Sequence, residues 1–442
     1  MSEYDFEPTF KQVSFLGLNM GFRELVEGSM IIDDPVSVDF QIRESSEANG
    51  NAPMVFNNIK EVLGHRVAIN ILTRKRLCES FGISPGELID ILSWAMKNPI
   101  EPQIITTREA PVLENTMDVV DLKMMPIPWH YQQDGGRYQS SSIIIAQYAG
   151  QRNTSFHRQL TKGSRETCVR LVPRHLRTMV DIAEESGHDV DIAVVNGPDP
   201  VVLLAGAMSF DEPLDELKVA AALHKRIYDT ELKIVELSNG VFVPAEAEYA
   251  MEARITGRKA EEGPYVDITG TVDDIRLEQI IEYDAIHHRT APIFHALIPA
   301  GVEHMTLMGM PRAPTIKTAV SKVVDCSDVY LTEGGSGWLS SVVQINPEKV
   351  GDGIKAIHAA LDGHKSMKQV IVVDQDIDIA DASRVEWALM TRWQPDKDTI
   401  ILSDQKGSSL DPSRSSKGTT SKIGMDATID PGIDRSPFES VL

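Results

Sequence analysis

The strongest constraint on the fold is the pattern of the chain beyond Pro102, where short runs of β-branched residues alternate with proline and glycine. Runs such as SSIIIAQY and VDIAVVNGPDP have the length of strands and end at turn residues, which favours a β-rich domain with short connections. Helical periodicity interrupts this pattern at residues 174–186 and 215–228. The middle of the chain is therefore predicted to be α+β rather than purely β.

The two ends of the chain have a different pattern. Amphipathic helices are predicted over residues 75–80 and 85–96, within a small N-terminal α/β region. The last third has a strand at 368–378, a helix at 381–392 and a strand at 398–404. This order predicts a βαβ unit and a partly parallel sheet covered by helices. We expect three domains, at residues 1–105, 106–305 and 306–442.

Two segments are interpreted as loops. Gly334, Gly335 and Gly337 follow an expected strand, and a tight turn is the commonest use of such a glycine cluster. Residues 407–420 are rich in serine, glycine and lysine. That composition indicates a mobile loop or a segment that becomes ordered on contact with a partner.

The composition limits the partners of the chain. Its 43 Lys and Arg against 65 Asp and Glu give a formal net charge of −22 at pH 7, which argues against nucleic acid or an anionic membrane surface as the main partner. The 3 cysteines lie far apart and form neither a zinc-ligand nor a disulfide pattern. The N-terminus lacks the pattern of a secretion signal, and no apolar run approaches the ~20 residues of a membrane span. We expect a soluble cytoplasmic protein.

Several common catalytic motifs are missing from the sequence. It contains no G-x-G-x-x-G after a strand, no G-x-x-x-x-G-K-[ST], no H-E-x-x-H and no G-x-S-x-G. The sequence therefore gives no motif-based support for dinucleotide binding, zinc-dependent proteolysis or serine hydrolysis.

Polar and cationic side chains gather between residues 153 and 177. Asn153, His157 and His175 offer metal-ligating or hydrogen-bonding groups in a chain that is otherwise acidic. A local positive segment suits an anionic ligand such as a phosphate, whose oxygens arginine binds with two parallel hydrogen bonds. The arginines of this segment are Arg158, Arg165, Arg170, Arg174 and Arg177.

A metal ion would fit the same segment, because Mg²⁺ or Mn²⁺ prefers oxygen ligands and bridges a phosphate to a carboxylate. The carboxylate would come from the stretch that holds Glu246, Glu248 and Glu252. Strand alternation would place Glu246 and Glu248 on one face. A solvated face of glutamates is the alternative interpretation of this stretch.

This segment also carries a specific resemblance. Asn153, FHR at 156–158, RLV at 170–172 and the following proline and His175 resemble the prenylated-flavin and metal motif of the UbiD-type decarboxylases. The resemblance implies a central split-β-barrel-like flavin-binding domain, flanked by an N-terminal α/β region and a C-terminal α/β domain. Further segments match in the family's order: APVLENTMD at 110–118, PIPWHYQQDGGRY at 126–138, NGPDP at 196–200, VPAEAE at 243–248, HHRTAPI at 287–293, residues 372–398 and SKIGMDAT at 421–428.

The resemblance also implies site residues. Asn153, His175 and Glu248 would hold a divalent metal, Mn²⁺ or Mg²⁺, with K⁺ as a possible second ion, and this metal would bind the phosphate of a prenylated FMN. Arg158 would belong to the catalytic network, with Glu303 as the proton donor. Glu282 and Asp284 are reserve candidates for that donor. The residues that would line the cofactor are Phe156, His157, Arg158, Arg170, Leu171, Val172 and His175.

The function implied by the resemblance is a non-oxidative decarboxylation of an unsaturated acid. The chain looks most like the archaeal branch, which makes isopentenyl phosphate from anhydromevalonate phosphate in isoprenoid (mevalonate) synthesis. Two alternatives stay open: a decarboxylase of a hydroxybenzoate or another aromatic acid, and a non-catalytic flavin-binding scaffold. The expected partners are a flavin prenyltransferase that supplies the cofactor and further copies of the chain, in a dimer or hexamer. A substrate phosphate would need a second cationic site, for which we consider Arg74, Lys75, Arg312 and Lys317.

Overall fold

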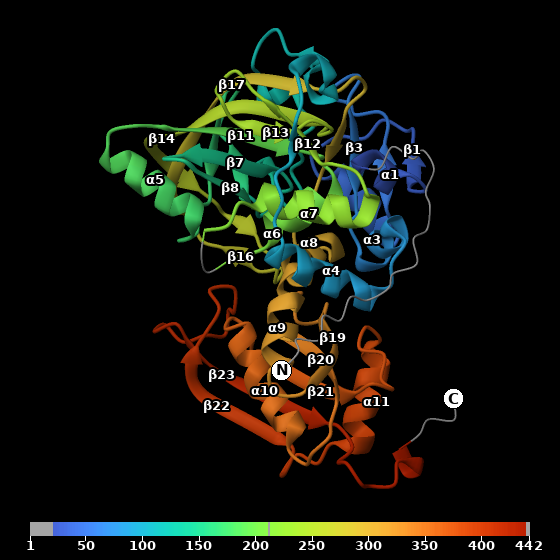
Figure 1. Cartoon of the computed structure of the whole chain (residues 1–442). Coiled ribbons are helices and arrows are strands. Elements are labelled where there is room, and N and C mark those ends of the chain that lie inside the picture. Colours follow the sequence, from blue (N-terminus) through green and yellow to red (C-terminus); the bar gives the residue numbers. More distant parts are fainter. Residues whose placement is uncertain (1–20, 211–212, 439–442) are drawn as a thin grey trace, which may run out of the picture.

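The computed structural model describes residues 21–210 and 213–438, which form two lobes (Figure 1). Helices α8 (Val302–Gly309) and α9 (Ala313–Val320) connect the larger lobe to the smaller one. Within the described residues, no helix is long and apolar enough to cross a membrane. The expectation of a missing secretion signal rests on residues that precede Gly21 and lie outside the described ranges.

An antiparallel sheet of nine strands is the centre of the larger lobe. Its two longest strands, β14 (Tyr249–Glu262) and β17 (Arg276–His288), pair antiparallel, as do all the other neighbours in this sheet. The pairings run in an open order, so the described residues contain no closed barrel, although the predicted mixed α/β multidomain fold is confirmed. The other strands are β5 (Asn115–Thr116), β6 (Tyr138–Gln139), β7 (Ile143–Tyr148), β8 (Gln151–Phe156), β9 (Gln159–Thr161), β10 (Glu166–Val169) and β11 (Val190–Asn196).

Helices cover both faces of this sheet, which explains the continuous apolar runs in β7 and β11. Ile143 and Val195 belong to the core shared with α6 (Pro200–Ala207) and α7 (Glu216–Tyr228). The alternate residues Ile144 and Val194 belong to the core shared with α5 (His175–Glu185) on the opposite face. The predicted helices over 174–186 and 215–228 are thus confirmed.

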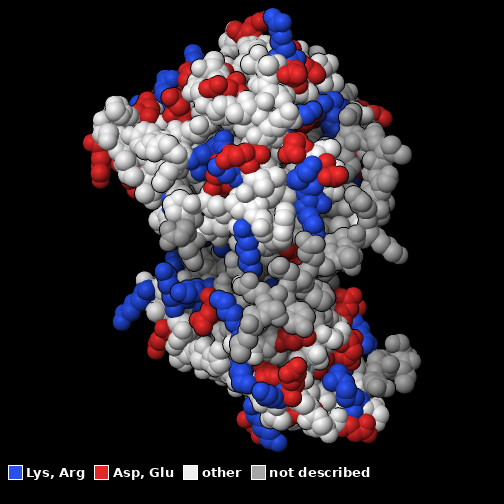
Figure 2. All heavy atoms as spheres, in the orientation of Figure 1, with Lys and Arg blue, Asp and Glu red and all other residues white. Residues whose placement is uncertain are grey.

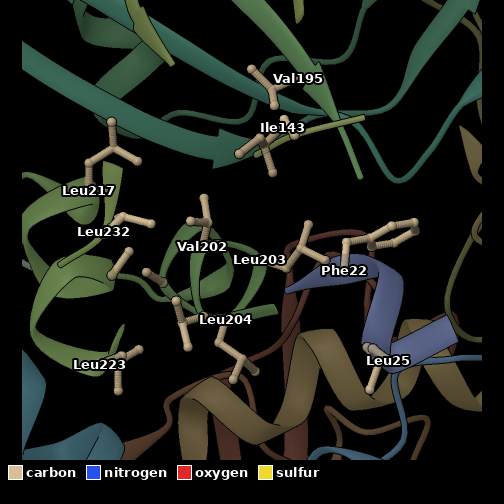
Figure 3. Packing of buried hydrophobic residues seen from close by; sticks show 14 of the residues in the cluster. Phe22, Leu25, Ile143, Val195, Val202, Leu203, Leu204, Leu217, Leu223 and Leu232 are labelled. Carbon is tan, nitrogen blue, oxygen red and sulfur yellow. The ribbon is translucent and has the colours of Figure 1, made fainter. Parts of the chain in front are cut away.

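Helix α6 is apolar on all sides because it lies between other elements. Val202, Leu203 and Leu204 are fully buried, and Figure 3 shows them between Ile143 on β7 and Leu223 on α7. This packing brings α7 close to β8. Asp199 and Asp215 begin the two helices, since each side chain accepts a hydrogen bond from a backbone N–H of the first turn.

A four-stranded sheet from the N-terminal region also takes a strand from the centre of the chain. β18 (Ile293–His295) pairs parallel with β3 (Arg66–Ile69), beside β2 (Met54–Phe56) and β1 (Met30–Ile32). The two predicted N-terminal helices are confirmed as α3 and α4. The helices of this part are α1 (Phe22–Val26), α2 (Gln41–Ala48), α3 (Arg74–Phe81) and α4 (Pro85–Lys97). Small sheets join β4 (Gln103–Ile104), β12 (Lys233–Glu236) and β13 (Phe242–Pro244), and β15 (Tyr265–Val266) with β16 (Val272–Asp273).

Glu303 connects the start of α8 to this N-terminal sheet. The side chain is fully buried, and its two oxygens accept hydrogen bonds from the backbone N–H groups of Asn70 and Leu72, both at 3.0 Å. His295 Nε2 lies 2.9 Å from Glu303 Oε1 as a third partner. A carboxylate held by three donors inside the core has a structural role, because its removal leaves those donors without partners.

The smaller lobe is a five-stranded sheet in the order β19-β20-β21-β23-β22. β20, β21 and β23 are parallel, which confirms the predicted partly parallel sheet. The simple βαβ prediction is wrong in one respect: β22 follows α11 but pairs antiparallel with β23 instead of lying parallel to β21. The elements are β19 (Asp325–Leu331), β20 (Ser340–Asn346), α10 (Asp352–Gly363), β21 (Gln369–Asp374), α11 (Ala382–Arg392), β22 (Thr399–Lys406) and β23 (Thr419–Ala427).

Both predicted loops are found in this lobe. The glycine cluster forms a turn between β19 and β20, as expected. Residues 407–418 connect β22 to β23, and buried side chains anchor this connection: Ser408 Oγ accepts a hydrogen bond from Trp338 Nε1, and Asp411 pairs with Lys368. The interpretation of the segment as a mobile loop is therefore replaced by that of a loop anchored to the lobe.

The structural role of Glu303 predicts the effect of removing it. Glu303→Ala leaves three buried donors unpaired and should lower the free energy of unfolding by about 3 kcal/mol, which thermal melting will show as a lower Tm. Glu386→Ala on the exposed side of α11 is the matched control and should melt like the unchanged protein. An unchanged Tm for Glu303→Ala would contradict the structural role.

Candidate active site

A buried arginine organises the polar cluster of the larger lobe. The Arg158 side chain follows β8 and is 9% exposed. Its Nε and Nη2 atoms donate to the two oxygens of Glu262 at 2.9 and 3.0 Å, while Nη1 donates to Asp267 at 2.7 Å and Nη2 to Asp273 at 2.8 Å. Burial alone would lower the pKa of Arg158, but Glu262 and Asp267 raise it above its ordinary value.

The acids around Arg158 come from the end of β14 and the β15–β16 hairpin. Glu262 is the last residue of β14 and has no exposed surface, and its Oε1 also accepts a hydrogen bond from Tyr138 at 3.1 Å. Asp267 follows β15, and its side chain is 20% exposed. The Tyr265 ring lies under the guanidinium at 4.5 Å. Asp267 and Asp273, which is 24% exposed, are thus the accessible acids of the cluster, whereas Glu262 is enclosed.

Two further groups shape this cluster. Asp134 accepts hydrogen bonds from Val266 N at 2.8 Å and Tyr131 N at 3.2 Å, so it holds the hairpin in place, and burial raises its pKa to about 6. His304 on α8 experiences the charges of Asp267 and Arg158. Burial lowers the pKa of His304, so its imidazole ring is neutral at pH 7.

These acids were missed by the sequence analysis. Glu262 and Asp267 lie 104 and 109 residues beyond Arg158 in the chain, so only tertiary packing brings them to it. A signal was present in the run EEGPYVDITGTVDD, where five acids accompany a Gly-Pro turn and a Thr-Gly-Thr sequence. Such a density of acids in a turn is ordinary for a surface loop, which is why the run did not stand out.

The predicted proton donors lie elsewhere. Glu303 is enclosed by Asn70, Leu72 and His295, as described above, and no hydrogen bond or ion pair joins it to Arg158 in the described residues. Glu282 pairs with Arg254 and Arg258, and Asp284 pairs with Arg254 at 2.7 Å, on the surface of β17. The structure does not bring any of the three to the arginine that they were expected to serve.

A second cluster forms where β8 meets the start of α7. Asn153 Nδ2 donates to Glu216 Oε1 at 3.0 Å, and Thr154 N donates to Glu216 Oε2 at 2.7 Å. The neighbouring pair Arg152 and Asp215 forms a salt bridge at 2.6 Å, which fixes the strand and the helix in this register. Glu216 is 3% exposed, and burial raises its pKa to about 8.

Around Asn153, the hydrogen-bond acceptors outnumber the available protons by one. The Ser155 hydroxyl lies 2.8 Å from Asn153 Oδ1 and 2.9 Å from His157 Nε2, but it has a single proton. His157 Nδ1 donates to the Arg170 carbonyl at 3.0 Å, and burial lowers the pKa of His157 to about 4, so Nε2 is an acceptor as well. A cation at Asn153 Oδ1 would satisfy the acceptor that the hydroxyl leaves unpaired.

Glu248 lies in a different environment from the one predicted. It occupies the turn between β13 and β14, where Glu246 is exposed and Glu248 is fully buried, so the two do not share a strand face. Glu248 forms a salt bridge with Arg23 at 2.6 Å and accepts a hydrogen bond from Ile293 N at 2.9 Å. Arg289 lies 3.7 Å away as a second cation. Glu248 thus has two cations beside it, whereas no ion pair is formed by Glu216 within the described residues.

The other predicted cofactor residues border the same region. His175 is the first residue of α5, which packs against β8. Arg170 N donates to the Arg158 carbonyl at 3.1 Å, and the Arg170 side chain pairs with Glu278. Leu171 is buried, whereas Phe156 is half-buried and Val172 is 38% exposed.

The donor set of the second cluster fits a hard divalent cation. The described residues contain no group of three or more His, Cys, Asp and Glu side chains suited to a metal, so any site there must include another ligand type. The amide oxygen of Asn153 is such a ligand, and within the described residues no cation pairs with the buried Glu216. The second cluster therefore suits a bound cation, whereas the first is a buried network of acids around Arg158.

Comparisons with known proteins identify the family of this chain. Residues 29–96, 103–302 and 305–427 match the N-terminal, Rift-related and C-terminal domains of 3-octaprenyl-4-hydroxybenzoate carboxy-lyase, the UbiD family. The chain is 41% identical, over 86% of its length and 90% of the relative's, to an anhydromevalonate phosphate decarboxylase of Methanocaldococcus jannaschii.

The fold is similar to solved structures of one enzyme in two forms. The UbiD-class enzyme HmfF from Pelotomaculum thermopropionicum in complex with FMN has a TM-score of 0.90 and 32% identity, with 96% of this chain and 97% of that one covered. An evolved dimeric form of HmfF in complex with prFMN has a TM-score of 0.85 and 30% identity, with 94% and 96% covered. The chain therefore belongs to the UbiD family of decarboxylases.

Proposed function

We propose that the chain is a prenylated-FMN-dependent decarboxylase that converts anhydromevalonate phosphate into isopentenyl phosphate. The observation that carries this proposal is the buried Arg158 with Glu262 and Asp267, an arginine and acid pair placed for carboxylate binding and proton delivery. The substrate follows from the relative that carries this activity and is 41% identical over most of both chains.

The cofactor would be held by the second cluster. Asn153, His175 and Glu216 would bind the divalent metal, Mn²⁺ or Mg²⁺, that holds the flavin phosphate, so Glu216 replaces Glu248 in the predicted ligand set. The uncompensated burial of Glu216 and the surplus acceptor at Asn153 support this assignment. When bound, the prenylated flavin supplies the electron sink that loss of CO₂ from an unsaturated carbon needs.

The side chains of the first cluster would bind the substrate carboxylate and deliver a proton. Arg158 orients the acids and provides positive charge beside the substrate carboxylate. Asp267, which is partly exposed, replaces Glu303 as the group that gives a proton to the carbon from which CO₂ has left. Glu262 holds the guanidinium in place through two hydrogen bonds and has no exposed surface of its own.

Several finer features belong to the same proposal. The domain boundaries near residues 105 and 305, the split-barrel character of the flavin domain and a K⁺ ion near the flavin site are carried over from the resemblance. The chain would receive its cofactor from a flavin prenyltransferase and would assemble as a dimer or hexamer in the cytoplasm. The dimeric HmfF structure with prFMN supports the cofactor and an oligomer.

The proposal is tested by co-expressing the chain with a flavin prenyltransferase. Released prenylated flavin, identified by absorbance and mass, together with isopentenyl phosphate formed from anhydromevalonate phosphate, is the expected result. Turnover of an aromatic acid in place of anhydromevalonate phosphate would contradict the proposed substrate but keep the decarboxylase. Absence of bound flavin would contradict the proposal as a whole.

The role of Asp267 predicts a loss of turnover without loss of cofactor. Asp267→Asn keeps a hydrogen-bonding group beside Arg158 but cannot deliver a proton, so kcat should fall by roughly 100-fold or more while the flavin content stays unchanged. Asp274→Asn, an exposed neighbour, is the control and should keep full activity. Full turnover of Asp267→Asn alongside an inactive Glu303→Gln would return the proton donor to Glu303.

The revised ligand set predicts a loss of metal. Glu216→Gln preserves the shape of the side chain but removes the carboxylate that would bind the metal, so metal content measured by elemental mass spectrometry and flavin retention should both fall, by roughly 10-fold or more. Glu246→Gln, which alters an exposed glutamate, should retain both. If Glu248→Gln loses the metal and Glu216→Gln keeps it, the third ligand is Glu248 after all.

A further inference from the structure

Asp273 is shared by two arginines at the edge of the cluster around Arg158. Figure 2 shows basic and acidic side chains intermixed over one face of both lobes, where water screens such charges. The Arg158 side chain differs from these, because it is largely buried and its donors are directed at carboxylates. Asp273 contacts it from β16, and Arg276, which Asp273 also binds, begins β17. The way in which the donors of Arg158 are divided therefore decides what else it can bind.

Four of the five N–H groups of Arg158 donate hydrogen bonds. Nε and Nη2 donate to the two oxygens of Glu262 at 2.9 and 3.0 Å, so Glu262 occupies one edge of the planar guanidinium. The second proton of Nη2 points away from that edge, and Asp273 accepts it at 2.8 Å. Asp267 accepts one proton of Nη1 at 2.7 Å, and within the described residues the other proton of Nη1 has no acceptor.

A substrate carboxylate needs an edge with two available N–H groups for the two-pronged contact that arginine makes with carboxylates. The edge formed by Nη1 and Nη2 is the candidate, because Glu262 already occupies the edge formed by Nε and Nη2. Asp273 binds the Nη2 proton of this candidate edge. An incoming carboxylate must therefore displace Asp273 from Arg158 or bind with a single hydrogen bond.

Arg276 provides a second binding partner for Asp273. Its Nη1 and Nη2 atoms donate to Asp273 Oδ2 and Oδ1, both at 2.7 Å, and the backbone N–H of Asp274 donates to Oδ1 at 3.0 Å. Burial raises the pKa of Asp273, but hydrogen bonds from Arg276 and Arg158 lower it to about 2, so this carboxylate is charged at neutral pH. Release from Arg158 thus costs Asp273 one hydrogen bond and leaves three in place.

The hairpin that carries Asp273 is lightly packed on one side. β15 and β16 pair through two residues each, in a small sheet of their own. Asp134 accepts a hydrogen bond from the backbone N–H of Val266, which anchors β15 and the Asp267 that follows it. Val272 on β16 is 51% exposed, so less packing holds this strand. Asp273 lies on the less packed strand, where a small shift toward Arg276 needs no rearrangement of the core.

We infer that Asp273 and Arg276 are a positioning pair: Asp273 occupies the edge of Arg158 that takes the substrate carboxylate, and Arg276 retains Asp273 when the substrate displaces it. The pair rests on the proposed function, because Arg158 must bind the carboxylate of the acid. It sets the affinity of Arg158 for carboxylates, since every acid has to replace an internal anion. After CO₂ has left, the product carries no carboxylate, and Asp273 returns to Arg158.

The two ends of the proposed substrate are separable in binding. Arg74 pairs with Asp328 at 3.1 Å and Lys317 pairs with Asp90 at 2.6 Å, so two of the cations considered from the sequence for the phosphate end are already occupied. A probe without a phosphate therefore isolates the carboxylate end.

The pair is tested by carboxylate binding to the flavin-loaded protein. 3-Methylbutanoate is the probe, because it has a carboxylate but no double bond and so reports binding without turnover. Asp273→Asn keeps the shape of the side chain but weakens it as a competitor, so the Kd from an NMR titration should fall by roughly 5-fold or more, and the KM for anhydromevalonate phosphate should fall with it. Asp274→Asn is the matched control, because it removes the same charge from an exposed neighbour, and it should leave the Kd unchanged.

The contribution of Arg276 is measured in two backgrounds. Arg276→Gln leaves Asp273 to bind Arg158 alone, so the Kd should rise by roughly 3-fold or more, whereas the same change added to Asp273→Asn should have no effect. A loss of positive charge alone would weaken binding equally in both backgrounds. Arg276→Lys keeps the charge but not the two-pronged contact, so its Kd should also rise.

The sign of the change in Kd separates the pair from a purely structural role, because a loosened hairpin would bind the probe more weakly. Unchanged or weaker binding by Asp273→Asn, or equal weakening by Arg276→Gln in both backgrounds, would overturn the pair even with full turnover of anhydromevalonate phosphate. If Asp273→Asn does not fold, an unchanged Kd for Arg276→Lys would overturn it. Tighter binding by Asp273→Asn in a chain that does not turn over this acid would support the pair and overturn only the proposed substrate.

Discussion

The larger lobe is organised around one buried guanidinium. Arg158 binds Glu262, Asp267 and Asp273 at once, and these acids come from the end of β14 and from the hairpin that follows it. Arg276 also binds Asp273, at 2.7 Å, so two guanidinium groups face the three carboxylates of this cluster. The same contacts hold the β15–β16 hairpin near the end of β8, so the side chains of the candidate active site also stabilise the fold.

The second polar cluster depends on the packing around α6. Helix α6 is buried on all sides, and this packing brings α7 into contact with β8. The salt bridge between Arg152 and Asp215 then fixes the position of the helix along the strand. Glu216 thereby meets Asn153 inside the protein. Glu248 differs from Glu216 in this respect: both glutamates are buried, but Glu248 pairs with Arg23, whereas no cation of the described residues pairs with Glu216, whose pKa burial raises.

Helix α8 connects the two lobes and borders the cluster around Arg158. Its His304 experiences the charges of Asp267 and Arg158, and its Glu303 is anchored in the N-terminal sheet through Asn70, Leu72 and His295. Anchoring this helix therefore also fixes the position of His304 beside the acids.

The sequence by itself determined the local structure and the family. Periodicity predicted α3, α4, α5, α7 and α11, and the motif from Asn153 to His175 identified the UbiD resemblance, because short-range patterns and motifs are written in neighbouring residues. The partners of Asn153 and Arg158 were decided only by tertiary structure. Glu216 and Asp267 reach them through contacts between residues 63 and 109 positions apart, and burial and charge compensation, which distinguish them from Glu248 and Glu303, exist only once the chain is folded.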